Sequence, residues 1–495
     1  MSKLMQRLYR LHLISPSGLC HFLWAFFKEG LNLMALVRFS AYYYPTRQAV
    51  IDERRTLTYV ELLTESGRLT NALRLRYSLK KNARVALLCR NHSEMVTALL
   101  ALSRLGTHIY FLNIEMSVDQ LQTQLAHSFD LVVYDFERQS DMERFCGGKK
   151  LLSSDISTLV AETPMKTLKK CTAGQMVVLT GGTSGTFKSA ARKPSVFSFL
   201  NPFFALIEEA HIDDYQSLYV ATPIYHGFGL SSLIVSLVMG KSLFIISHYH
   251  TENACALIRK YQIEVAAIVP LMLQRMLNAD ADALMSLKCI LSGGALLDER
   301  LVKQSQQKLG GVLYNLYGTS EAGFSTIATP DALRKYPNTV GRPIRGLQFR
   351  VVRPNQVGFG TLEVNCAWSM DNKQQKWVST GDLARINDEG FLFLCGRSDD
   401  MIVSAGENVY PDTLERAIMM CDDVETAVVI SVADVEFGQR LKAFVVLKPN
   451  SSWDEQSLLT WLSEHVARYE MPVKVVLLDE IPLLETGKID RRKLL

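Results

Sequence analysis

The sequence predicts an α/β protein, in which a large N-terminal domain of layered α/β subdomains precedes a small C-terminal α+β domain on a hinge. Two observations predict this architecture. Over the first 400 residues, strand-like runs alternate with helical patterns, which is typical of largely parallel sheets covered by helices. From about residue 397, short strand-like runs instead flank one amphipathic helical pattern. We therefore predict domains over residues 1–396 and 397–495, joined at the polar segment "GRSDDM".

The alternation is clearest from residue 83 onwards. "ARVALLC" is predicted to be a buried strand and "EMVTALLALSRLG" a helix, since Val96, Leu99 and Leu100 have helical spacing and Gly106 is a stop signal. Further strands are predicted in the N-terminal domain at "HIYFLNI", "DLVVYD", "GQMVVLT", "SLYVAT", "SLFIIS", "VAAIVP" and "KCILSGG". The C-terminal domain is predicted to have strands at "AVVISVAD", "KAFVVLKP" and "VKVVLLDEIP", and a helix at "EQSLLTWLSEHVARY".

The composition is that of an ordinary globular protein, with 48% hydrophobic and 21% charged residues. A formal net charge of +4 is small for 495 residues, and no basic stripe with interleaved aromatic residues occurs, so nucleic-acid binding is not expected. The nine cysteines are scattered without a C-x-x-C pair, which argues against a zinc site or a disulfide framework. This cysteine usage fits a reducing compartment, and we expect a cytoplasmic protein.

Two apolar stretches raise the question of membrane contact. Residues 215–240 lack acidic and basic side chains, but Pro223 and three glycines interrupt them, so we expect a buried strand, a loop and a helix. The N-terminal residues 1–30 have a basic start and an apolar run, but no small-x-small cleavage site. We therefore favour an N-terminal helix over a signal peptide, and expect this helix either to pack on the protein or to dock at the periphery of a membrane.

The segment "TGGTSGTFKSAARK" (180–193) has the composition of a phosphate-binding loop. Its glycines allow backbone N–H groups to face one concavity, its hydroxyl side chains add donors, and Lys188 adds a positive charge. A P-loop would need glycine where Phe187 stands, which excludes that motif. The loop follows the strand-like "MVVL", and ligands of α/β sheets bind beyond the carboxyl ends of strands. This placement favours phosphate binding over an exposed linker.

Four further motifs follow in order: "ATPIYHGFG" (221–229), "YNLYGTSEAG" (314–323), the segment from "STGDLAR" to "YPDTLE" (379–415), and "ETGKIDRRKL" (485–494). With the glycine-rich loop, they resemble the motifs of the adenylate-forming superfamily of acyl-CoA synthetases, adenylation domains and luciferases. The resemblance covers nearly the whole chain and is strongest to a fatty acyl-CoA synthetase. In this superfamily the glycine-rich loop holds the pyrophosphate end of ATP.

The resemblance implies which residues neutralise charge while a carboxylate attacks the α-phosphate of ATP. Lys488, in "TGKIDR", would be the catalytic lysine that bridges the carboxylate and the α-phosphate. Glu321 and Thr183 would hold Mg²⁺, a hard cation that prefers oxygen ligands, and Ser320 would donate to the α-phosphate. The remaining phosphate contacts would come from Thr180, Thr183, Ser184, Gly185, Thr186 and Lys188.

The nucleoside and the acyl group have implied partners as well. Asp382 would accept the ribose hydroxyls, and Arg397 would reach the same ribose. Adenine would be bound by Tyr317, Gly318 and the backbone of Gly293, Gly294 and Ala295. His226 would act at the acyl pocket, which it lines and gates. The predicted walls of this pocket suit an aliphatic chain and consist of Tyr225, His226, Phe228, Leu230, Val269, Pro270 and Leu316.

Two positions in the C-terminal domain have roles implied by the resemblance: Asp399 aligns with the hinge of the superfamily, and Gly406 with its CoA tunnel. The glycine-rich loop departs from the superfamily pattern, because Gly181 replaces Ser, Phe187 replaces Pro, and Ser189 replaces Gly. These changes affect the role of Lys188 more than the activity, because the loop amides remain.

We therefore predict an AMP-forming acyl-CoA synthetase that uses ATP, Mg²⁺ and CoA on a medium- to long-chain fatty acid. "ATPIYHGFG" has no acidic residue that could hold an α-ammonium, which favours a fatty acid over an amino acid. An enzyme that loads a separate acyl carrier protein is the nearest alternative, with luciferase-like oxidation as a more distant one. The altered loop supports an alternative of another class, a non-catalytic acyl-nucleotide-binding homologue.

Overall fold

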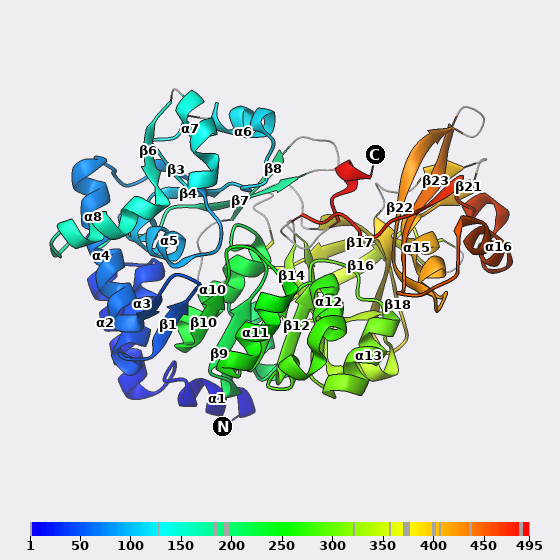
Figure 1. Ribbon diagram of the computed structural model, residues 1–495. Coiled ribbons are helices and arrows are strands. Elements are labelled where there is room, and N and C mark those ends of the chain that lie inside the picture. The colour runs from blue at the N-terminus through cyan, green and yellow to red at the C-terminus, as the bar shows by residue number, and fades with distance from the viewer. Residues whose placement is uncertain are drawn as a thin grey trace.

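The structure is a computed structural model that describes residues 2–126, 128–145, 147–181, 187–192, 199–319, 322–355, 358–369, 377–397, 402–404, 407–434, 438–484 and 489–494. For residues 179–181, 187–192, 403, 404, 407, 408, 438, 469 and 492 it describes the backbone alone. The described residues form three sheets, of thirteen, six and five strands, and Figure 1 shows how they are arranged. The two larger sheets belong to the N-terminal part of the chain and the five-stranded sheet to the part after residue 401, which confirms the predicted fold class.

The thirteen-stranded sheet forms the middle of the molecule. Its spatial order is β16 (Gln348–Val352), β17 (Gly360–Asn365), β18 (Val378–Ile386), β19 (Leu392–Arg397), β15 (Thr339–Pro343), β14 (Gly323–Ala328), β13 (Leu313–Thr319), β12 (Cys289–Gly293), β11 (Val265–Ile268), β9 (Ser217–Val220), β10 (Ser242–Ile245), β1 (Gln48–Ile51) and β2 (Thr56–Thr58). The associated helices are α9 (Leu200–Glu209), α10 (Gly227–Met239), α11 (Thr251–Tyr261), α12 (Pro270–Asp280), α13 (Glu299–Leu309) and α14 (Pro330–Lys335).

Only half of this sheet is parallel. The strands from β1 to β13 in the spatial order pair in parallel, and β11 among them is buried along its whole length because helices cover both faces. From β13 to β16 in that order, every pair is antiparallel. The expectation of largely parallel sheets is therefore wrong for this half. Apart from the step from β15 to β16, each strand is followed along the chain by an antiparallel neighbour, without a crossover to a parallel one.

The six-stranded sheet lies beside the middle sheet and matches the predicted parallel pattern. Its order is β6 (Lys149–Leu152), β5 (Leu131–Tyr134), β3 (Arg84–Leu88), β4 (His108–Phe111), β7 (Met176–Gly181) and β8 (Phe187–Arg192). Only β8 is antiparallel to its neighbour. The helices of this part are α4 (Tyr59–Arg76), α5 (Ser93–Leu105), α6 (Val118–Leu125), α7 (Gln139–Arg144) and α8 (Ile156–Glu162). The helix predicted before Gly106 is α5.

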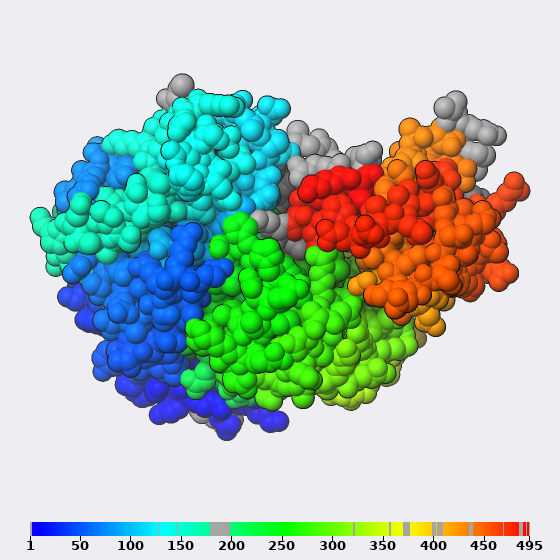
Figure 2. Space-filling model, viewed as in Figure 1, coloured from blue at the N-terminus to red at the C-terminus, as the bar shows by residue number. Residues whose placement is uncertain are grey.

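The five-stranded sheet contains β20 (Ile402–Ser404), β21 (Glu407–Val409), β22 (Val424–Asp434), β23 (Gly438–Leu447) and β24 (Lys474–Leu477). Helices α15 (Pro411–Met419) and α16 (Glu455–His465) belong to the same unit; α16 is the helix predicted from the amphipathic pattern, and α15 was not predicted. In Figure 2 this unit, in orange and red, lies against the green middle of the chain. The exact domain bounds at residues 396 and 397 stay a prediction.

Three helices precede the sheets: α1 (Lys3–Arg10), α2 (Pro16–Glu29) and α3 (Leu33–Tyr43). Pro16 occupies the first turn of α2, directly after the N-cap residue Ser15. The proline therefore begins α2. Arg7 and Arg10 of α1 form ion pairs with Asp213 and Asp214, which attach the N-terminal helix to the segment before β9. Within the described residues, no helix has the length and apolar character required to cross a bilayer.

Candidate functional site

The predicted phosphate loop joins the two strands of a β-hairpin. Strand β7 runs parallel to β4 and ends at Gly181, and β8 returns antiparallel with Thr180 paired to Lys188. The loop therefore follows the carboxyl end of a strand in a parallel sheet, as the sequence predicted. The predicted phosphate ligands Thr183, Ser184, Gly185 and Thr186 lie outside the described residues, and of Thr180 and Lys188 only the backbone is described.

Three residues of the predicted nucleoside site come together from three strands of the middle sheet: Asp382 and Arg397 from the neighbouring β18 and β19, and Tyr317 from β13, which β15 and β14 separate from β19 in the sheet order. Tyr317 of β13 donates its hydroxyl to the Asp382 carboxylate of β18, although 65 residues separate them in the chain. Asp382 pairs in register with Arg397 of β19, and Arg397 Nη1 lies 3.4 Å from Asp382 Oδ1. Burial first, and then the negative charge of Asp382, hold the pKa of Tyr317 well above its usual range, so this phenol stays a hydrogen-bond donor.

The backbone around Asp382 is shaped for this arrangement. Gly381 has a φ of +77°, and a Cβ at this position would lie 2.5 Å from Arg397 Nη2. A side chain at Gly381 would therefore displace the guanidinium from Asp382. The Thr380 hydroxyl donates to the Leu362 carbonyl and accepts from the Asp382 amide, which ties the strand end that carries the carboxylate to β17.

The predicted adenine-binding backbone lies at the end of β12, beside β13. Gly293 pairs in register with Leu316, and a Cβ on Gly293 would lie 3.1 Å from the Leu316 carbonyl oxygen and 3.6 Å from Phe228. Gly294 follows with a φ of +84°, which favours glycine. The absence of a side chain at Gly293 therefore leaves space between the predicted nucleoside site and two predicted acyl-pocket residues, Phe228 and Leu316. Ala295 follows directly, and Gly318 follows Tyr317 on β13.

His226 lies at the start of α10, with its ring 4.7 Å from the ring of Tyr225, centroid to centroid. Tyr225 and Leu230 are buried in the same core cluster, against which Phe228 and Leu316 also pack. Val269 is buried in a different cluster, formed with α11 and α12, and Pro270 begins α12. The structure therefore groups Tyr225, His226, Phe228, Leu230 and Leu316, but it does not group Val269 with them. The role of Val269 and Pro270 in the acyl pocket stays a prediction.

Asn91 holds the loop that carries His226, and the sequence analysis did not identify it. The Asn91 side-chain amide donates to the Thr222 carbonyl at 3.1 Å, and its oxygen accepts from the Ile224 amide at 2.8 Å. Asn91 is buried and lies directly after β3, on the loop between β3 and α5. Asn91 follows the carboxyl end of a predicted strand, where ligand sites of α/β sheets lie, and this position could have identified it from the sequence.

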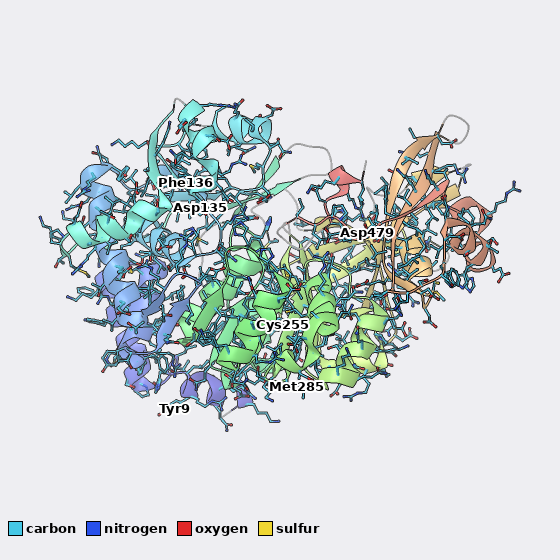
Figure 3. The ribbon with its side chains drawn as sticks, in the orientation of Figure 1. Tyr9, Asp135, Phe136, Cys255, Met285 and Asp479 are labelled. Carbon is cyan, nitrogen blue, oxygen red and sulfur yellow. The ribbon has the colours of Figure 1, made fainter. Side chains whose placement is uncertain are left out.

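Charged residues gather at the same edge of the six-stranded sheet. The chain leaves β3 toward β4 on one side and later returns to β5 on the other, so the crevice between β3 and β5 is the topological switch point of this sheet. Arg90 follows β3 and forms ion pairs with Glu115 and Glu137 at 2.7 and 2.6 Å. Asp135 and Phe136, labelled in Figure 3, follow β5. The sequence analysis did not identify this cluster either.

A buried histidine links the two loops. His92 lies between Glu94 at 3.0 Å and Asp135 at 2.9 Å, and Ser153 donates to the same Asp135 oxygen. Burial disfavours charge on His92, but the two carboxylates outweigh it and raise its pKa to about 9, while the pKa values of Glu94 and Asp135 fall to about 2. Cys89 lies within 4.8 Å of His92 and Asp135. Because both ring nitrogens of His92 contact carboxylates, we interpret the cluster as a structural ion triad.

Other predicted site residues lie outside the described residues. They are the metal ligand Glu321, the α-phosphate donor Ser320, the catalytic lysine Lys488, the hinge residue Asp399 and the CoA-tunnel residue Gly406. Their roles stay predictions. In the sequence, Asp399 falls between the end of β19 at Arg397 and the start of β20 at Ile402.

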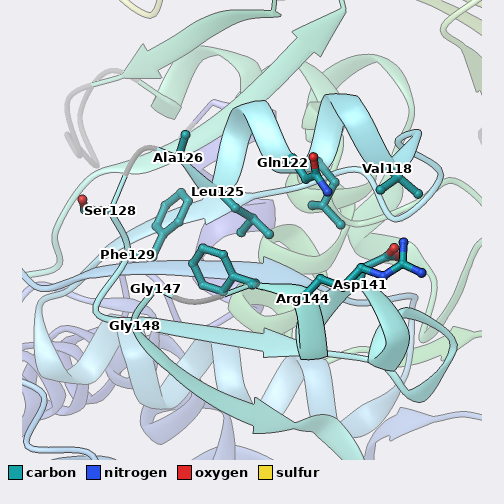
Figure 4. Close-up of a pocket in the computed structure, with 12 residues that line it drawn as sticks. Val118, Gln122, Leu125, Ala126, Ser128, Phe129, Asp141, Arg144, Gly147 and Gly148 are labelled. Carbon is teal, nitrogen blue, oxygen red and sulfur yellow. The ribbon is translucent and has the colours of Figure 1, made fainter.

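A cavity of about 410 Å³ lies elsewhere, between α6, α7 and the amino ends of β5 and β6 (Figure 4). Leu121, Leu125 and Phe129 form much of its apolar wall, and Asp141 and Arg144 lie at one side. The carboxyl ends of β3 and β5, where Asn91 and Arg90 lie, are at the opposite edge of the sheet. This cavity is therefore separate from the candidate site.

Comparison with known proteins agrees with this geometry. The model of the AMP-binding enzyme family matches residues 37–361, more than half of the chain, and the model of the AMP-binding enzyme C-terminal domain matches residues 413–488. The 2-succinylbenzoate–CoA ligases of Bacillus licheniformis and Bacillus subtilis are each 27% identical to this chain. The alignments cover 91% of this chain in both cases, and 97% and 95% of the respective relatives.

Solved structures show the same similarity. The o-succinylbenzoate CoA synthetase from Bacillus subtilis with its acyl-adenylate intermediate has a TM-score of 0.80 and 25% identity, covering 93% of this chain and 97% of that chain. An anthranilate CoA ligase in complex with anthranoyl-AMP shares the fold, with a TM-score of 0.83 at 19% identity over 94% of this chain and 96% of that chain. The chain belongs to the AMP-binding enzyme family, within the adenylate-forming superfamily that its motifs predicted.

Proposed function

We propose that this protein uses ATP and Mg²⁺ to convert a carboxylic acid into an acyl-adenylate, and then transfers the acyl group to CoA. The observation that carries the proposal is the meeting of Tyr317, Asp382 and Arg397 beside the open backbone of Gly293, in a chain of the AMP-binding enzyme family. The same relative from Bacillus subtilis has been solved with ATP and magnesium, at 25% identity and a TM-score of 0.79 over 93% of this chain and 98% of that chain.

The described residues fit a nucleotide. Asp382 offers a carboxylate to ribose hydroxyls, while Tyr317 and Arg397 fix its orientation. Three buried hydroxyls near the carboxyl ends of β9 and β12, on Thr222, Tyr225 and Ser292, have no hydrogen-bond partner among the described residues. Buried polar groups are normally satisfied, so these hydroxyls suit the polar atoms of a bound ligand.

The chemical step needs charge to be neutralised, because a carboxylate approaches the α-phosphate of a polyanion. The predicted residues for this purpose are Lys488 and the loop 180–188, with Mg²⁺ held by Glu321 and Thr183 to supply further positive charge. The described part contributes orientation: Asn91 fixes the loop of His226, and the adjacent Phe228 and Leu316 bound the space next to the nucleoside residues.

For the acid we propose an apolar carboxylic acid of medium to long chain. Of the described wall residues, Tyr225, Phe228, Leu230 and Leu316 carry no charge and all pack in or against one hydrophobic cluster, and His226 lies beside Tyr225. Transfer of an aliphatic chain from water to such a surface is favourable. The aromatic diacid 2-succinylbenzoate is a second candidate, favoured by the names of the curated relatives. Its second carboxylate would need a cation or several donors, and among the described wall residues only Tyr225 and His226 carry a polar group.

A pyrophosphate-release assay tests the proposal. The purified full-length protein is given ATP and Mg²⁺ with fatty acids of increasing chain length, 2-succinylbenzoate, or an amino acid, each with and without CoA. We expect release with the fatty acids and formation of acyl-CoA only when CoA is present. Faster turnover of 2-succinylbenzoate than of any fatty acid would identify 2-succinylbenzoate as the substrate instead of a fatty acid. Acyl transfer to a carrier protein but not to CoA would identify the carrier protein as the acceptor. If no acid causes release of pyrophosphate, the result would support the alternative of a non-catalytic nucleotide-binding protein.

A further inference from the structure

Helix α2 presents a row of large apolar side chains to solvent. Leu19, Leu23 and Phe27 are spaced four residues apart and so lie on one face of the helix, with 46%, 67% and 68% of their surface exposed. Trp24 lies beside this row, and Leu31 continues it beyond the end of the helix. We name these five exposed residues the α2 stripe. Single exposed apolar residues are ordinary, but a continuous row of them marks an interaction surface.

The stripe cannot turn inward, because the opposite face of α2 is already packed. Ala25 is buried, and the ring of Phe22 meets those of Phe26 and Phe39 edge-on at 4.6 and 5.1 Å between centroids. Phe39 belongs to α3, which separates α2 from the rest of the core, so that α2 forms the outer layer of this end of the molecule (Figure 1). The packed face therefore holds the stripe toward solvent.

The border of the stripe is positively charged. Glu29 is the single acidic residue of α2, and it is buried in ion pairs with Arg38 and Arg104. Lys28 is exposed at the end of the helix, and Lys170 lies with its ammonium 4.9 Å from the centre of the Phe27 ring. The exposed Lys169 belongs to the same segment, which Arg104 ties to the end of α2 through the Lys169 carbonyl.

The dimensions of α2 exclude one type of membrane contact. The helix has 14 residues, which at about 1.5 Å per residue gives roughly 21 Å, less than the about 30 Å of a bilayer core. An apolar face with lysines at its margin is instead typical of a helix that lies in the plane of the interface, with apolar side chains among the lipid chains and ammonium groups at the headgroups.

We propose that the α2 stripe docks this protein on the surface of an anionic lipid bilayer. Charge favours this occupant over a second copy of the chain, because a symmetric dimer through the stripe would bring Lys28, Lys169 and Lys170 close to the same lysines of its partner. Anionic headgroups attract these lysines, and the attraction weakens as salt is added. The proposal does not depend on the reaction that the protein catalyses.

Flotation of the full-length protein with vesicles tests the proposal. The vesicles contain either phosphatidylcholine alone or phosphatidylcholine with one third phosphatidylglycerol, and the variant is Leu23→Glu/Phe27→Glu. The matched control is Met285→Glu/Met420→Glu, which places the same charges on methionines of similar exposure, 59% and 67%, away from α2. Nucleotide binding, followed by calorimetry, shows that each variant is folded, and sedimentation without lipid gives the oligomeric state.

We expect wild type and control to float with the anionic vesicles and the stripe variant to bind at least tenfold more weakly. Binding of the wild type should fall on neutral vesicles and at high salt. Equal flotation of the folded stripe variant would overturn the proposal, as would a failure of the wild type to bind either vesicle. A lipid-free dimer that dissociates in the stripe variant would also overturn it, since the stripe would then face a second copy.

Discussion

The phenolic hydroxyl of Tyr317 on β13 donates to the carboxylate of Asp382 on β18, although β19, β15 and β14 lie between these two strands in the order of the middle sheet. The carboxylate is almost completely buried and has Arg397 on its other oxygen. A buried carboxylate with two partners has a defined orientation. We infer that this pair sets the direction in which Asp382 can accept hydrogen bonds from a ribose.

Tyr317→Phe should weaken ATP binding without abolishing adenylation. The change removes one hydrogen bond to a charged group, a contribution of about 1.5–3 kcal/mol, and leaves Arg397 as the remaining partner of Asp382. We expect the KM for ATP to rise about tenfold and kcat to change little. Tyr314→Phe, at another buried tyrosine of the same strand, is the control and should leave the KM for ATP unchanged. An unchanged KM in Tyr317→Phe would mean that this hydrogen bond does not orient Asp382 for the nucleotide.

Asn91→Ala should impair the acid-dependent step. The variant loses both hydrogen bonds that fix residues 222–224, so the adjacent His226 is no longer held in one position. We expect kcat for adenylation to fall about tenfold, measured as pyrophosphate release at saturating ATP. Asn71→Ala is the control, since Asn71 is also buried and also holds a distant carbonyl, that of Pro164. A similar loss of kcat in both variants would show general destabilisation instead of positioning.

The triad of Glu94, His92 and Asp135 should make stability depend on pH. The pKa of His92 is raised from 6.5 to about 9, so its contribution is complete below pH 6.5 and is lost as the pH rises to about 9. The carboxylates, with pKa values near 2, contribute fully above about pH 4.5 and lose their contribution in acid. Between pH 6.5 and 9 the contribution of His92 to stability should fall by up to about 3 kcal/mol, as 1.36 kcal/mol corresponds to one pKa unit.

Urea unfolding of wild type and His92→Asn across this pH range measures the effect. The variant should be less stable than the wild type at pH 6, and the difference between the two proteins should shrink by up to about 3 kcal/mol from pH 6.5 to 9. If both proteins lose stability in parallel over that range, His92 is not protonated in the folded protein at neutral pH.

Lys488→Ala should slow acyl-adenylate formation by at least about 10²-fold, the scale for loss of one group that stabilises a transition state. Lys488 lies in the "TGKIDR" motif. Preformed acyl-adenylate supplied to the variant should still give acyl-CoA, which separates the two half-reactions. Adenylation close to the normal rate would remove Lys488 from the mechanism.

Asp399→Pro should block the second half-reaction. In the sequence, Asp399 falls between β19 and β20, and proline fixes φ near −65° at a joint that is predicted to rotate. We expect adenylation at nearly the normal rate and thioester formation reduced at least tenfold. Loss of both half-reactions would indicate misfolding, and normal rates in both would place the hinge elsewhere.

The sequence by itself determined many of the elements and the family. Strands such as β3 and β11 and the helix α5 are visible as apolar runs or helical spacing, because hydrophobic periodicity is a local property of the chain. The motifs also predicted that Tyr317, Asp382 and Arg397 share a site, and the structure brings them together. Which acid is bound was not determined in this way, since the walls of a pocket come from distant segments.

Only the tertiary structure decided which of these local elements face one another. The antiparallel half of the middle sheet, the hold of Asn91 on the loop of His226, and the triad around His92 all depend on strand order, which joins residues far apart in the chain. Helix α2 likewise has apolar residues on all of its faces, so its sequence alone does not show which face is buried. Packing of Phe22 and Ala25 on α3 decides which side is buried, and so leaves Leu19, Leu23 and Phe27 in solvent.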